Sequence, residues 1–237
     1  MKLIPSIDLE DGVAVKRVAG RRGTGLRLGD PVELARRIAS YGFTWVHVVD
    51  LDAAEKGELG KETLGILREI TGLGLRVEYG GGVRSLEVAE AVCSAGASRL
   101  VIGSAWLRDP GILGEAREQT GCEVLAAVEE DRDGFLVTRG WREKTPLSLE
   151  EAIKIVAASG ATGVLYTQVW VEGSLRGPDL DRARRLRELY PGFIVFSGGV
   201  SSLRDVEALA SLGFDAVVVG MALYTGRIGW EEAARYA

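Results

Sequence analysis

Short apolar runs alternate along the chain with longer stretches in which apolar residues recur at helical spacing. Uninterrupted apolar runs are typical of parallel strands covered on both faces, and the stretches between them are typical of amphipathic helices. Eight such runs occur, each followed by a helical stretch. They span residues 3–8, 45–51, 76–81, 99–103, 123–129, 163–169, 193–198 and 216–220.

The helical stretches have clear ends. Those at residues 31–42, 85–96, 148–160 and 202–213 begin with Ser, Asp or Pro and end on Gly, as capped helices commonly do. Eight strand–helix units in 237 residues predict an α/β fold, a (β/α)8 TIM barrel, whose usual size is about 250 residues. An open, doubly wound sheet is the structural alternative, but the lack of a domain-sized break favours one closed domain over residues 1–237.

An internal repeat supports the barrel. Residues 81–105 align with residues 198–222 without a gap, and 12 of the 25 positions are identical. The same offset of 117 places Asp50 on Thr167 and Glu55 on Glu172, and a separate overlay places Asp8 against Glu129. These matches predict that the barrel consists of two duplicated half-barrels, residues 1–120 and 121–237.

Two carboxylates end strands at the same place in each half. In this fold the reactive groups lie at the carboxyl ends of the strands, where Asp8 follows the first strand and Glu129 the fifth. Two carboxyl groups facing each other across the barrel mouth are suited to moving protons on a small substrate. The alternative for Asp8 is a strand-end residue that makes turn or cap hydrogen bonds. Trp141 and Arg142 follow a predicted hairpin at residues 135–139 and either cover the mouth or pack on the surface.

Paired glycine turns predict two phosphate sites. Each half has a Gly-Gly-Val segment before a helix and a second turn after the next strand. Backbone N–H groups at such helix starts bind anions, and glycine lets the anion approach closely. Two facing sites predict a ligand with a phosphate at each end; the alternative is that the glycines serve only turns and packing. The candidate phosphate-binding residues are Gly81, Gly82, Gly103, Ser104, Gly198, Gly199, Gly220 and Met221, with the amides of Ser201 and Ser202 facing the same place.

Composition narrows the function classes. The 34 acidic against 29 basic side chains give a net charge of −5, which disfavours a nucleic-acid binder. The chain has no membrane-length apolar run and does not begin like a signal peptide, so we expect a cytoplasmic protein without membrane contact. The absence of Asn and the excess of Arg over Lys suggest a hot environment, although genomic base composition produces the same bias.

Cysteine and histidine are too sparse for several kinds of site. Cys93 and Cys122 are separate and form no Cys-x-x-Cys pair, which predicts neither a zinc site nor a disulfide. His47 is the only histidine and lies in an apolar strand, so we expect a packed core residue. A serine–histidine triad, a metal site and the common nucleotide motifs are therefore not expected.

These residues resemble a known family over essentially the whole chain, the phosphoribosylformimino-5-aminoimidazole carboxamide ribotide isomerases of histidine biosynthesis. The resemblance implies a duplicated barrel with two phosphate sites and an Amadori rearrangement of an aminoaldose to an aminoketose. It also implies a small bisphosphate ribonucleotide as substrate and no metal or organic cofactor. We further expect a monomer, although the sequence does not determine the oligomeric state. The motifs that carry it are IPSIDLEDG (4–12), VKRVAG (15–20), DPVELA (30–35), HVVDLDAA (47–54), GGGVRS (80–85), IGS (102–104), GW (140–141), SGGVSS (197–202) and VVGMALYTG (218–226).

The resemblance also implies catalytic roles. Asp8 is expected to be the base that takes the proton from C2, a second carboxylate the acid that opens the ribose ring, and Thr167 a group that steadies the intermediate. Two positions depart from the family, which usually has Asp where this chain has Glu129, and Asp-Gly-Thr where it has Glu172, Gly173 and Ser174. The extra methylene moves each carboxylate by about 1 Å, a shift that matters in a tuned site. We expect Glu129 or Glu172 to remain the acid.

Three rival interpretations remain. The related cyclase, imidazole glycerol phosphate synthase, usually has Cys-Leu-Asp-Val at strand one and a nearby Lys, whereas PSIDLEDG and RVAGRRGTG fit the isomerase better. A dual-substrate isomerase would also process phosphoribosyl anthranilate, with Arg21, Arg22 or Arg142 binding the anthranilate carboxylate. A non-catalytic phosphosugar-binding barrel is the third possibility.

Overall fold

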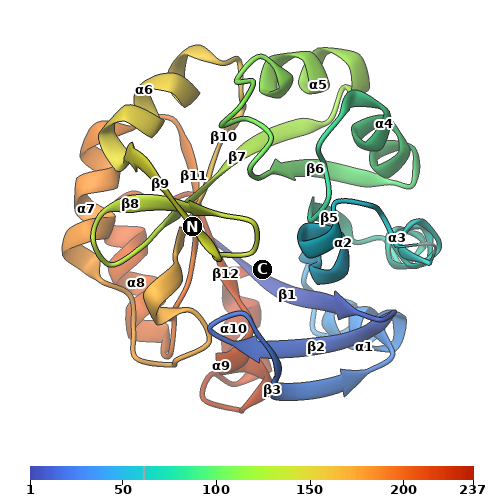
Figure 1. Cartoon of the computed structure of the whole chain (residues 1–237). Coiled ribbons are helices and arrows are strands. Elements are labelled where there is room, and N and C mark those ends of the chain that lie inside the picture. The colour runs from blue at the N-terminus through green and yellow to red at the C-terminus, as the bar shows by residue number, and fades with distance from the viewer. Residues whose placement is uncertain (61) are drawn as a thin grey trace.

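Eight parallel strands close into a barrel in the computed structural model, which describes residues 1–60 and 62–237. The ring order is β1, β4, β5, β6, β7, β10, β11 and β12, and β12 pairs with β1 to close it (Figure 1). The predicted (β/α)8 TIM barrel is thereby confirmed. The strand bounds are β1 Lys2–Glu10, β4 Trp45–Asp50, β5 Arg76–Gly80, β6 Ala97–Ile102, β7 Glu123–Glu130, β10 Gly163–Gln168, β11 Phe193–Ser197 and β12 Ala216–Val219.

Helices surround the barrel because their apolar stripes face the strands, and several of them have a polar cap at the start. The Asp30 carboxylate accepts hydrogen bonds from the first turn of α1, and Ser148 forms a capping box with Glu151 at α6. The helices are α1 Pro31–Ser40, α2 Leu51–Lys56, α3 Thr63–Gly72, α4 Leu86–Ser94, α5 Ile112–Thr120, α6 Leu149–Ala158, α7 Leu180–Leu189, α8 Leu203–Ser211, α9 Met221–Tyr224 and α10 Trp230–Ala233, with 3-10 turns η1 Val169–Val171 and η2 Ala234–Tyr236. No described helix is long and apolar enough to cross a membrane.

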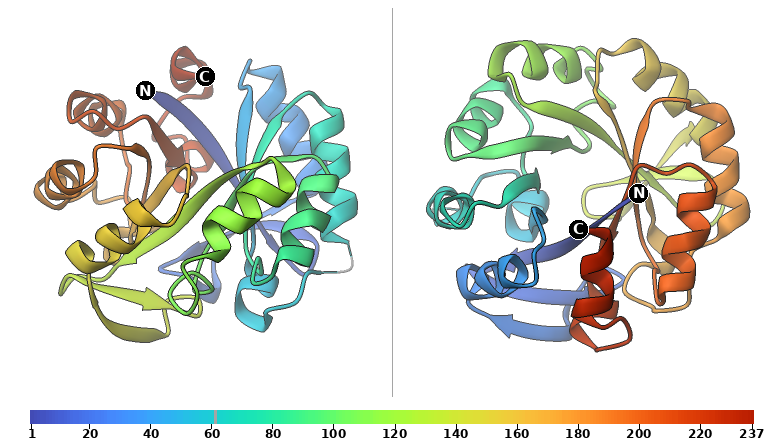
Figure 2. Two further views of the ribbon diagram at one scale, coloured as in Figure 1. Left: turned by 90° about the horizontal axis from the view of Figure 1, so that it is seen from above. Right: turned by 180° about the vertical axis from the view of Figure 1, so that it is seen from behind.

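Two antiparallel hairpins interrupt the regular pattern, one after β1 and one after β7. The first consists of β2 Val13–Val18 and β3 Arg21–Gly29, and the second of β8 Phe135–Thr138 and β9 Glu143–Ser148. The sequence predicted only the second, because β3 is almost entirely exposed and carries no apolar pattern. The chain ends lie at the end of the barrel opposite the second hairpin (Figure 2, left).

The equivalence between the halves differs by one residue from the sequence alignment. A Cβ added to Gly81 would meet the backbone of Asp50, and one added to Gly198 would meet the backbone of Gln168. Asp50 therefore corresponds to Gln168 and not to Thr167. The first half has one more residue between strand and glycine turn, since 81 − 50 is 31 whereas 198 − 168 is 30.

The same correction moves the second alignment pair. Gly82 packs on Ala53 as Gly199 packs on Val171, an offset of 118. Glu172 thus corresponds to Ala54, and the predicted match with Glu55 is wrong. The half-barrel duplication itself stays a prediction.

The two cysteines form a disulfide, which corrects the expectation of separate thiols. Cys93 lies in α4 and Cys122 just before β7, with Cα atoms 6.5 Å apart and a sequence separation of 29. The residues were too distant in sequence for a motif to show the pairing, which arises because α4 packs beside α5.

We expect the disulfide to add substantially to stability. Replacing both cysteines with Ala should lower the free energy of unfolding by about 3 kcal/mol, because the unfolded chain regains the freedom of a closed loop. Chemical unfolding with and without a reductant measures this. The reductant should destabilise the native chain and leave the double variant unaffected; equal effects on both would contradict the prediction.

Candidate active site

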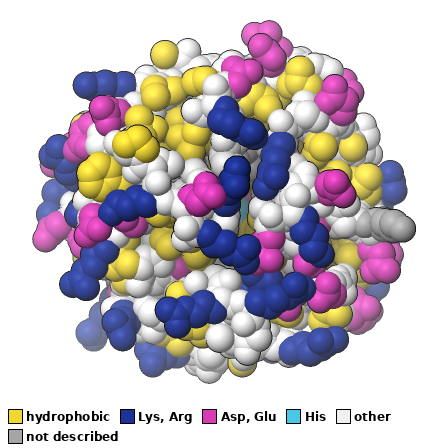
Figure 3. Space-filling view, in the orientation of Figure 1, with side chains coloured by type: hydrophobic (Ala, Val, Ile, Leu, Met, Phe, Trp, Pro, Cys, Tyr) yellow, Lys and Arg dark blue, Asp and Glu magenta, His cyan; other side chains and the backbone are white. Residues whose placement is uncertain are grey.

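One cavity of about 220 Å³ opens at the carboxyl ends of the barrel strands. Lys and Arg side chains gather around the hollow at the centre of this face (Figure 3). Except for Ser201 and Ser202, the residues that the sequence singled out for catalysis or phosphate binding line the cavity. These are Asp8, Gly81, Gly82, Gly103, Ser104, Glu129, Thr167, Glu172, Gly198, Gly199, Gly220 and Met221.

The ring order of the strands arranges these residues on two crossed axes. Asp8 ends the first barrel strand and Glu129 the fifth, so the two carboxyl groups face each other across the mouth. The glycine turns follow β5 and β6 on one side and β11 and β12 on the other, and two strands separate the pairs in each direction. The acid–base axis therefore crosses the axis that joins the two candidate phosphate sites.

Lys16 is the site residue that the sequence analysis missed. Its ammonium lies 2.5 Å from a carboxylate oxygen of Asp8 and 2.5 Å from Oγ of Ser6, and only 6% of its side chain is exposed. It also packs against Gly220, where an added Cβ would lie 2.8 Å from Nζ. Lys16 holds the Asp8 carboxylate in place and adds a positive charge beside one glycine turn. The sequence did contain a signal for this residue: Lys16 lies in a segment of alternating apolar and polar residues after Asp8, which forms β2 and directs the lysine inward.

We expect the ion pair of Asp8 and Lys16 to stabilise the fold measurably. Lys16→Met should lower the free energy of unfolding by about 2 kcal/mol, less than for a fully buried pair because Asp8 keeps some solvent contact. The same substitution in an Asp8→Asn background should cost much less, since its partner charge is already gone. Chemical unfolding of the four proteins gives the coupling; additive losses would contradict it.

Glu129 is held in an apolar setting that favours its protonated form. Burial raises the pKa of its carboxyl to about 7, and the hydrogen bond from Trp141 opposes the shift only in part. The Trp141 indole Nε1 donates to Glu129 Oε1 at 2.7 Å. The β8–β9 turn thus covers the mouth, as one of the two expectations for Trp141 had it. A carboxyl that titrates near neutrality is suited to act as a general acid.

Glu172 is the second carboxyl with a raised pKa. Burial is the main cause, Lys16 opposes the shift, and the negative charge of Asp8 adds to it. Glu172 is therefore close enough to the Asp8–Lys16 pair to feel both charges. Its backbone oxygen accepts a hydrogen bond from the Ala19 amide at 3.3 Å, which ties this loop to the β2–β3 turn.

Thr167 lies beside Glu129, because the two residues pair in register between β10 and β7. Its side chain is 5% exposed and lines the cavity. The next residue, Gln168, faces away from the mouth and exchanges two hydrogen bonds with the backbone of Asp179. Thr167 thus contributes a buried hydroxyl group to the cavity wall beside Glu129.

The glycine turns of the two halves have the same backbone conformation. Gly81 and Gly82 have φ values of 105° and 73°, and Gly198 and Gly199 have 107° and 74°. These left-handed values, with the close contacts to Asp50 and Gln168, explain why only glycine fits. One expectation was wrong: the amides of Ser201 and Ser202 donate to the Asp205 carboxylate and are not available to an anion.

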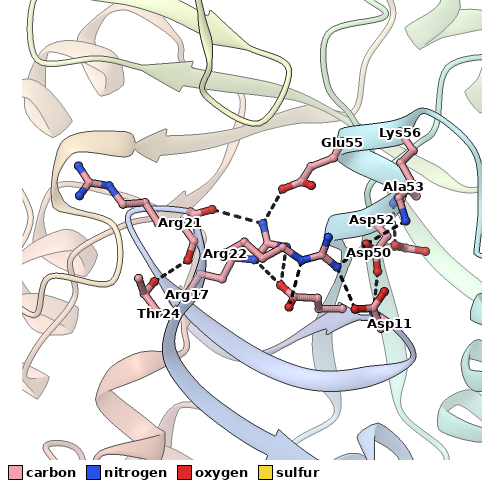
Figure 4. Close-up of polar contacts among 12 residues, drawn as sticks. Asp11, Arg17, Arg21, Arg22, Thr24, Asp50, Asp52, Ala53, Glu55 and Lys56 are labelled. Carbon is pink, nitrogen blue, oxygen red and sulfur yellow. Dashed lines mark hydrogen bonds and ion pairs between the residues drawn. The ribbon is translucent and has the colours of Figure 1, made fainter.

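Ion pairs join the loops around the mouth (Figure 4). Arg17 bridges Glu10 and Glu55, and Arg142 from the β8–β9 turn also reaches Glu55 at 3.2 Å. Arg22 is occupied by Asp11 and other carboxylates of this cluster. Arg21 points away from the acidic groups in Figure 4 and makes no ion pair with a described residue. Of the three arginines considered for a substrate carboxylate, it is the one whose charge is uncompensated.

No group of three or more His, Cys, Asp or Glu side chains within residues 1–60 and 62–237 is placed to hold a metal ion. The polar groups that line the cavity are carboxyl groups, a lysine, a histidine, two arginines, serine and threonine hydroxyls, and the backbone amides of the glycine turns.

Known proteins are similar to this sequence over nearly its whole length. A family model described as "Histidine biosynthesis protein" matches residues 2–229. A protein of Natronomonas pharaonis is 39% identical over 98% of this chain and 97% of its own length, and one of Methanothermobacter thermautotrophicus is 39% identical over 100% and 98%. A third, from Caldicellulosiruptor bescii, is 37% identical over 98% of both chains. All three are named 1-(5-phosphoribosyl)-5-((5-phosphoribosylamino)methylideneamino)imidazole-4-carboxamide isomerase.

Proposed function

The chain belongs to the histidine biosynthesis protein family, and from this premise we propose that it is an isomerase acting on the phosphoribosyl imidazole carboxamide of its relatives. The reaction is an Amadori rearrangement of that aminoaldose to its aminoketose, without metal or organic cofactor. The observation that carries the proposal is the crossing of two axes in one cavity: Asp8 opposite Glu129, and one pair of glycine turns opposite the other.

The glycine turns support a substrate with a phosphate at each end. Gly81, Gly82, Gly103 and Ser104 form one candidate site, and Gly198, Gly199, Gly220 and Met221 the other. Backbone amides hold phosphate without a basic pocket, which is consistent with a net charge of −5. Lys16 beside Gly220 adds a buried positive charge to the second site. A ligand anchored at both ends has its central ribosylamine between the carboxyl groups.

The carboxyl groups divide the proton transfers between them. A protonated Glu129 or Glu172 gives its proton to the ribose ring oxygen, the C1–O bond breaks, and the nitrogen lone pair forms an iminium. The Asp8 carboxylate then removes the proton from C2, and the electron pair of that C–H bond forms the enaminol. A proton returns from Asp8 to C1, the C2 hydroxyl gives its proton to the carboxylate that opened the ring, and the ketone forms at C2, so the reaction is redox neutral overall. Thr167 is placed to hydrogen-bond the intermediate.

Two alternatives remain under the same geometry. A dual-substrate isomerase would use Arg21, the uncompensated arginine, for the carboxylate of phosphoribosyl anthranilate. A non-catalytic barrel would bind the bisphosphate and leave it unchanged. The proposal further takes the chain to be a cytoplasmic monomer that binds neither nucleic acid nor membrane, and the two half-barrels to be duplicates.

Assays with each aminoaldose separate the three functions. We expect turnover of the phosphoribosyl imidazole carboxamide, followed by the appearance of its aminoketose, and no need for added metal. Turnover of phosphoribosyl anthranilate as well, lost in Arg21→Ala, would establish the dual enzyme. Tight binding of the bisphosphate without turnover of either substrate would overturn the proposal in favour of the binding protein.

A further inference from the structure

The only histidine lies in the wall of the cavity, one layer deeper than Asp8. Strand register places His47 beside Ser6, whereas Asp8 pairs with Val49. His47 lines the cavity, and its Nδ1 lies 2.7 Å from Oε1 of Glu78. The sequence predicted a packed core residue, and His47 is indeed only 5% exposed, but its surroundings are polar. Nε2, on the other side of the ring, is the nitrogen that this contact leaves free.

Glu78 is an acceptor in this contact. Burial alone would raise the pKa of its carboxyl, but the interactions with His47 and Arg99 outweigh it and lower the pKa. The second oxygen of Glu78 accepts a hydrogen bond from Nη1 of Arg99 at 2.9 Å. An ionised carboxylate has no proton to donate, so the hydrogen in the contact with His47 belongs to Nδ1.

Arg99 fixes this arrangement from the other side. Its guanidinium lies between the rings of Trp45 and Phe193, at 4.3 and 4.7 Å from their centroids. Its Nε donates to the carboxylate of Glu123 at 2.6 Å. A guanidinium that packs against two aromatic rings and donates to two carboxylates is held in this orientation.

The buried series of polar side chains formed by His47, Glu78 and Arg99 is not needed to fill the barrel. The other inward residues are mostly apolar, among them Ile4, Val101, Leu125, Leu165 and Val195. Apolar side chains of similar volume fill such interiors at no cost in stability, whereas buried ions must overcome their desolvation. Because this series of polar and charged side chains begins with His47 at the cavity wall, it points to a role in the cavity.

We propose that Glu78, held by Arg99, is a positioning residue that fixes the tautomer of His47, and that His47 presents bare Nε2 to the ligand as a hydrogen-bond acceptor. Resting on the proposed function, the partner of Nε2 is a donor of the central ribosylamine, a hydroxyl or N–H group. The contact orients the sugar deep in the cavity while Asp8 acts one layer above.

The tautomer is directly measurable because the chain has one histidine. In protein labelled with 15N-histidine, the two ring nitrogens give a single pair of signals. At mildly alkaline pH we expect Nδ1 to carry the proton and Nε2 to have the shift of an unprotonated nitrogen. A protonated Nε2 in the unliganded protein, in either the neutral or the charged ring, overturns the assignment.

Glu78→Gln should invert the tautomer. The Gln oxygen stays with Arg99, which can only donate, and the amide NH2 turns to Nδ1, so the ring proton moves to Nε2. Glu123→Gln is the matched control, because it removes a carboxylate from the same guanidinium without touching His47. An unchanged spectrum in Glu78→Gln, or an inverted one in Glu123→Gln, contradicts the positioning role.

His47→Asn tests the ligand contact separately. The Asn amide takes the place of Nδ1–H toward Glu78, so the buried carboxylate keeps a donor while Nε2 is lost. We expect kcat/KM for the phosphoribosyl imidazole carboxamide to fall about tenfold, mainly through KM, as for one lost hydrogen bond. Unchanged KM and kcat would refute the contact. Absence of turnover in the unmodified protein would instead refute the proposed function, and the NMR result would still decide the tautomer.

Discussion

Asp8→Asn should lower kcat by about a thousandfold or more, with the fold intact. The amide occupies the same space beside Lys16 but cannot take a proton from C2, and general-base catalysis commonly contributes 10²- to 10⁴-fold. KM should change little, because the candidate phosphate sites are on other strands. Steady-state kinetics with the phosphoribosyl imidazole carboxamide measures both parameters.

Asp11→Asn is the control for this substitution. Asp11 lies in the turn between β1 and β2, is mostly exposed, and pairs with Arg22 outside the cavity. It should retain near-normal kcat, and circular dichroism should show both variants folded. Near-normal turnover in Asp8→Asn would remove Asp8 from the mechanism.

Glu129→Gln should have the second largest effect, a loss of about a hundredfold in kcat. A carboxyl whose pKa is raised to about 7 is protonated below neutrality and can donate to the ring oxygen there. The native enzyme should therefore lose activity as the pH rises through about 7. Glutamine has no proton to give, so the variant should show low activity without that decline.

Glu172→Gln decides which carboxyl is the acid. Both carboxyls have raised pKa values, but Glu172 is coupled to Asp8 and Lys16, whereas Glu129 interacts mainly with Trp141. If the alkaline decline persists in Glu129→Gln and disappears in Glu172→Gln, Glu172 is the acid and the assignment to Glu129 is wrong.

The same pKa shift affects stability, which should fall with rising pH as the activity does, whereas Glu129→Gln should lower activity and raise stability at alkaline pH. The pKa of Glu129 is above its ordinary value of 4.5 in the folded chain, so the folded state binds the proton more tightly. Its favourable contribution is complete below pH 4.5 and is lost as the pH rises through about 7. Above that pH, Glu129→Gln should be more stable than the native chain by about 2 kcal/mol, since the side chain is only partly shielded from solvent. Thermal unfolding at acid and alkaline pH tests it, with no gain expected in acid.

Much of the fold was predictable because it depends on local patterns. Apolar strands, capped helices and glycine turns each have a local pattern that can be recognised in a single sequence. Asp8 and Glu129 could be predicted because they lie at the ends of predicted strands. The sequence alignment of the two halves was wrong by one residue at the strand that precedes the glycine turn. An ungapped alignment cannot show the one-residue insertion between that strand and the turn.

What the sequence did not predict depends on contacts between distant segments. Lys16 acquires its role only when β2 folds back along β1, and Cys93 meets Cys122 only when α4 and α5 pack. His47 was taken for a core residue because its neighbours in sequence are apolar. Its polar surroundings come from the charged side chains of Glu78 and Arg99, which lie on two other strands.

The two chain ends lie close enough together to allow circular permutation of the barrel. β12 pairs with β1, the Lys2 amide donates to the backbone oxygen of Asp215, and both ends lie side by side away from the mouth (Figure 2). The link between α5 and β7 at Gly121 is exposed, with φ of 71°. A circular permutant that joins Ala237 to Met1 and opens the chain after Gly121 would keep every strand pairing and leave the cavity intact.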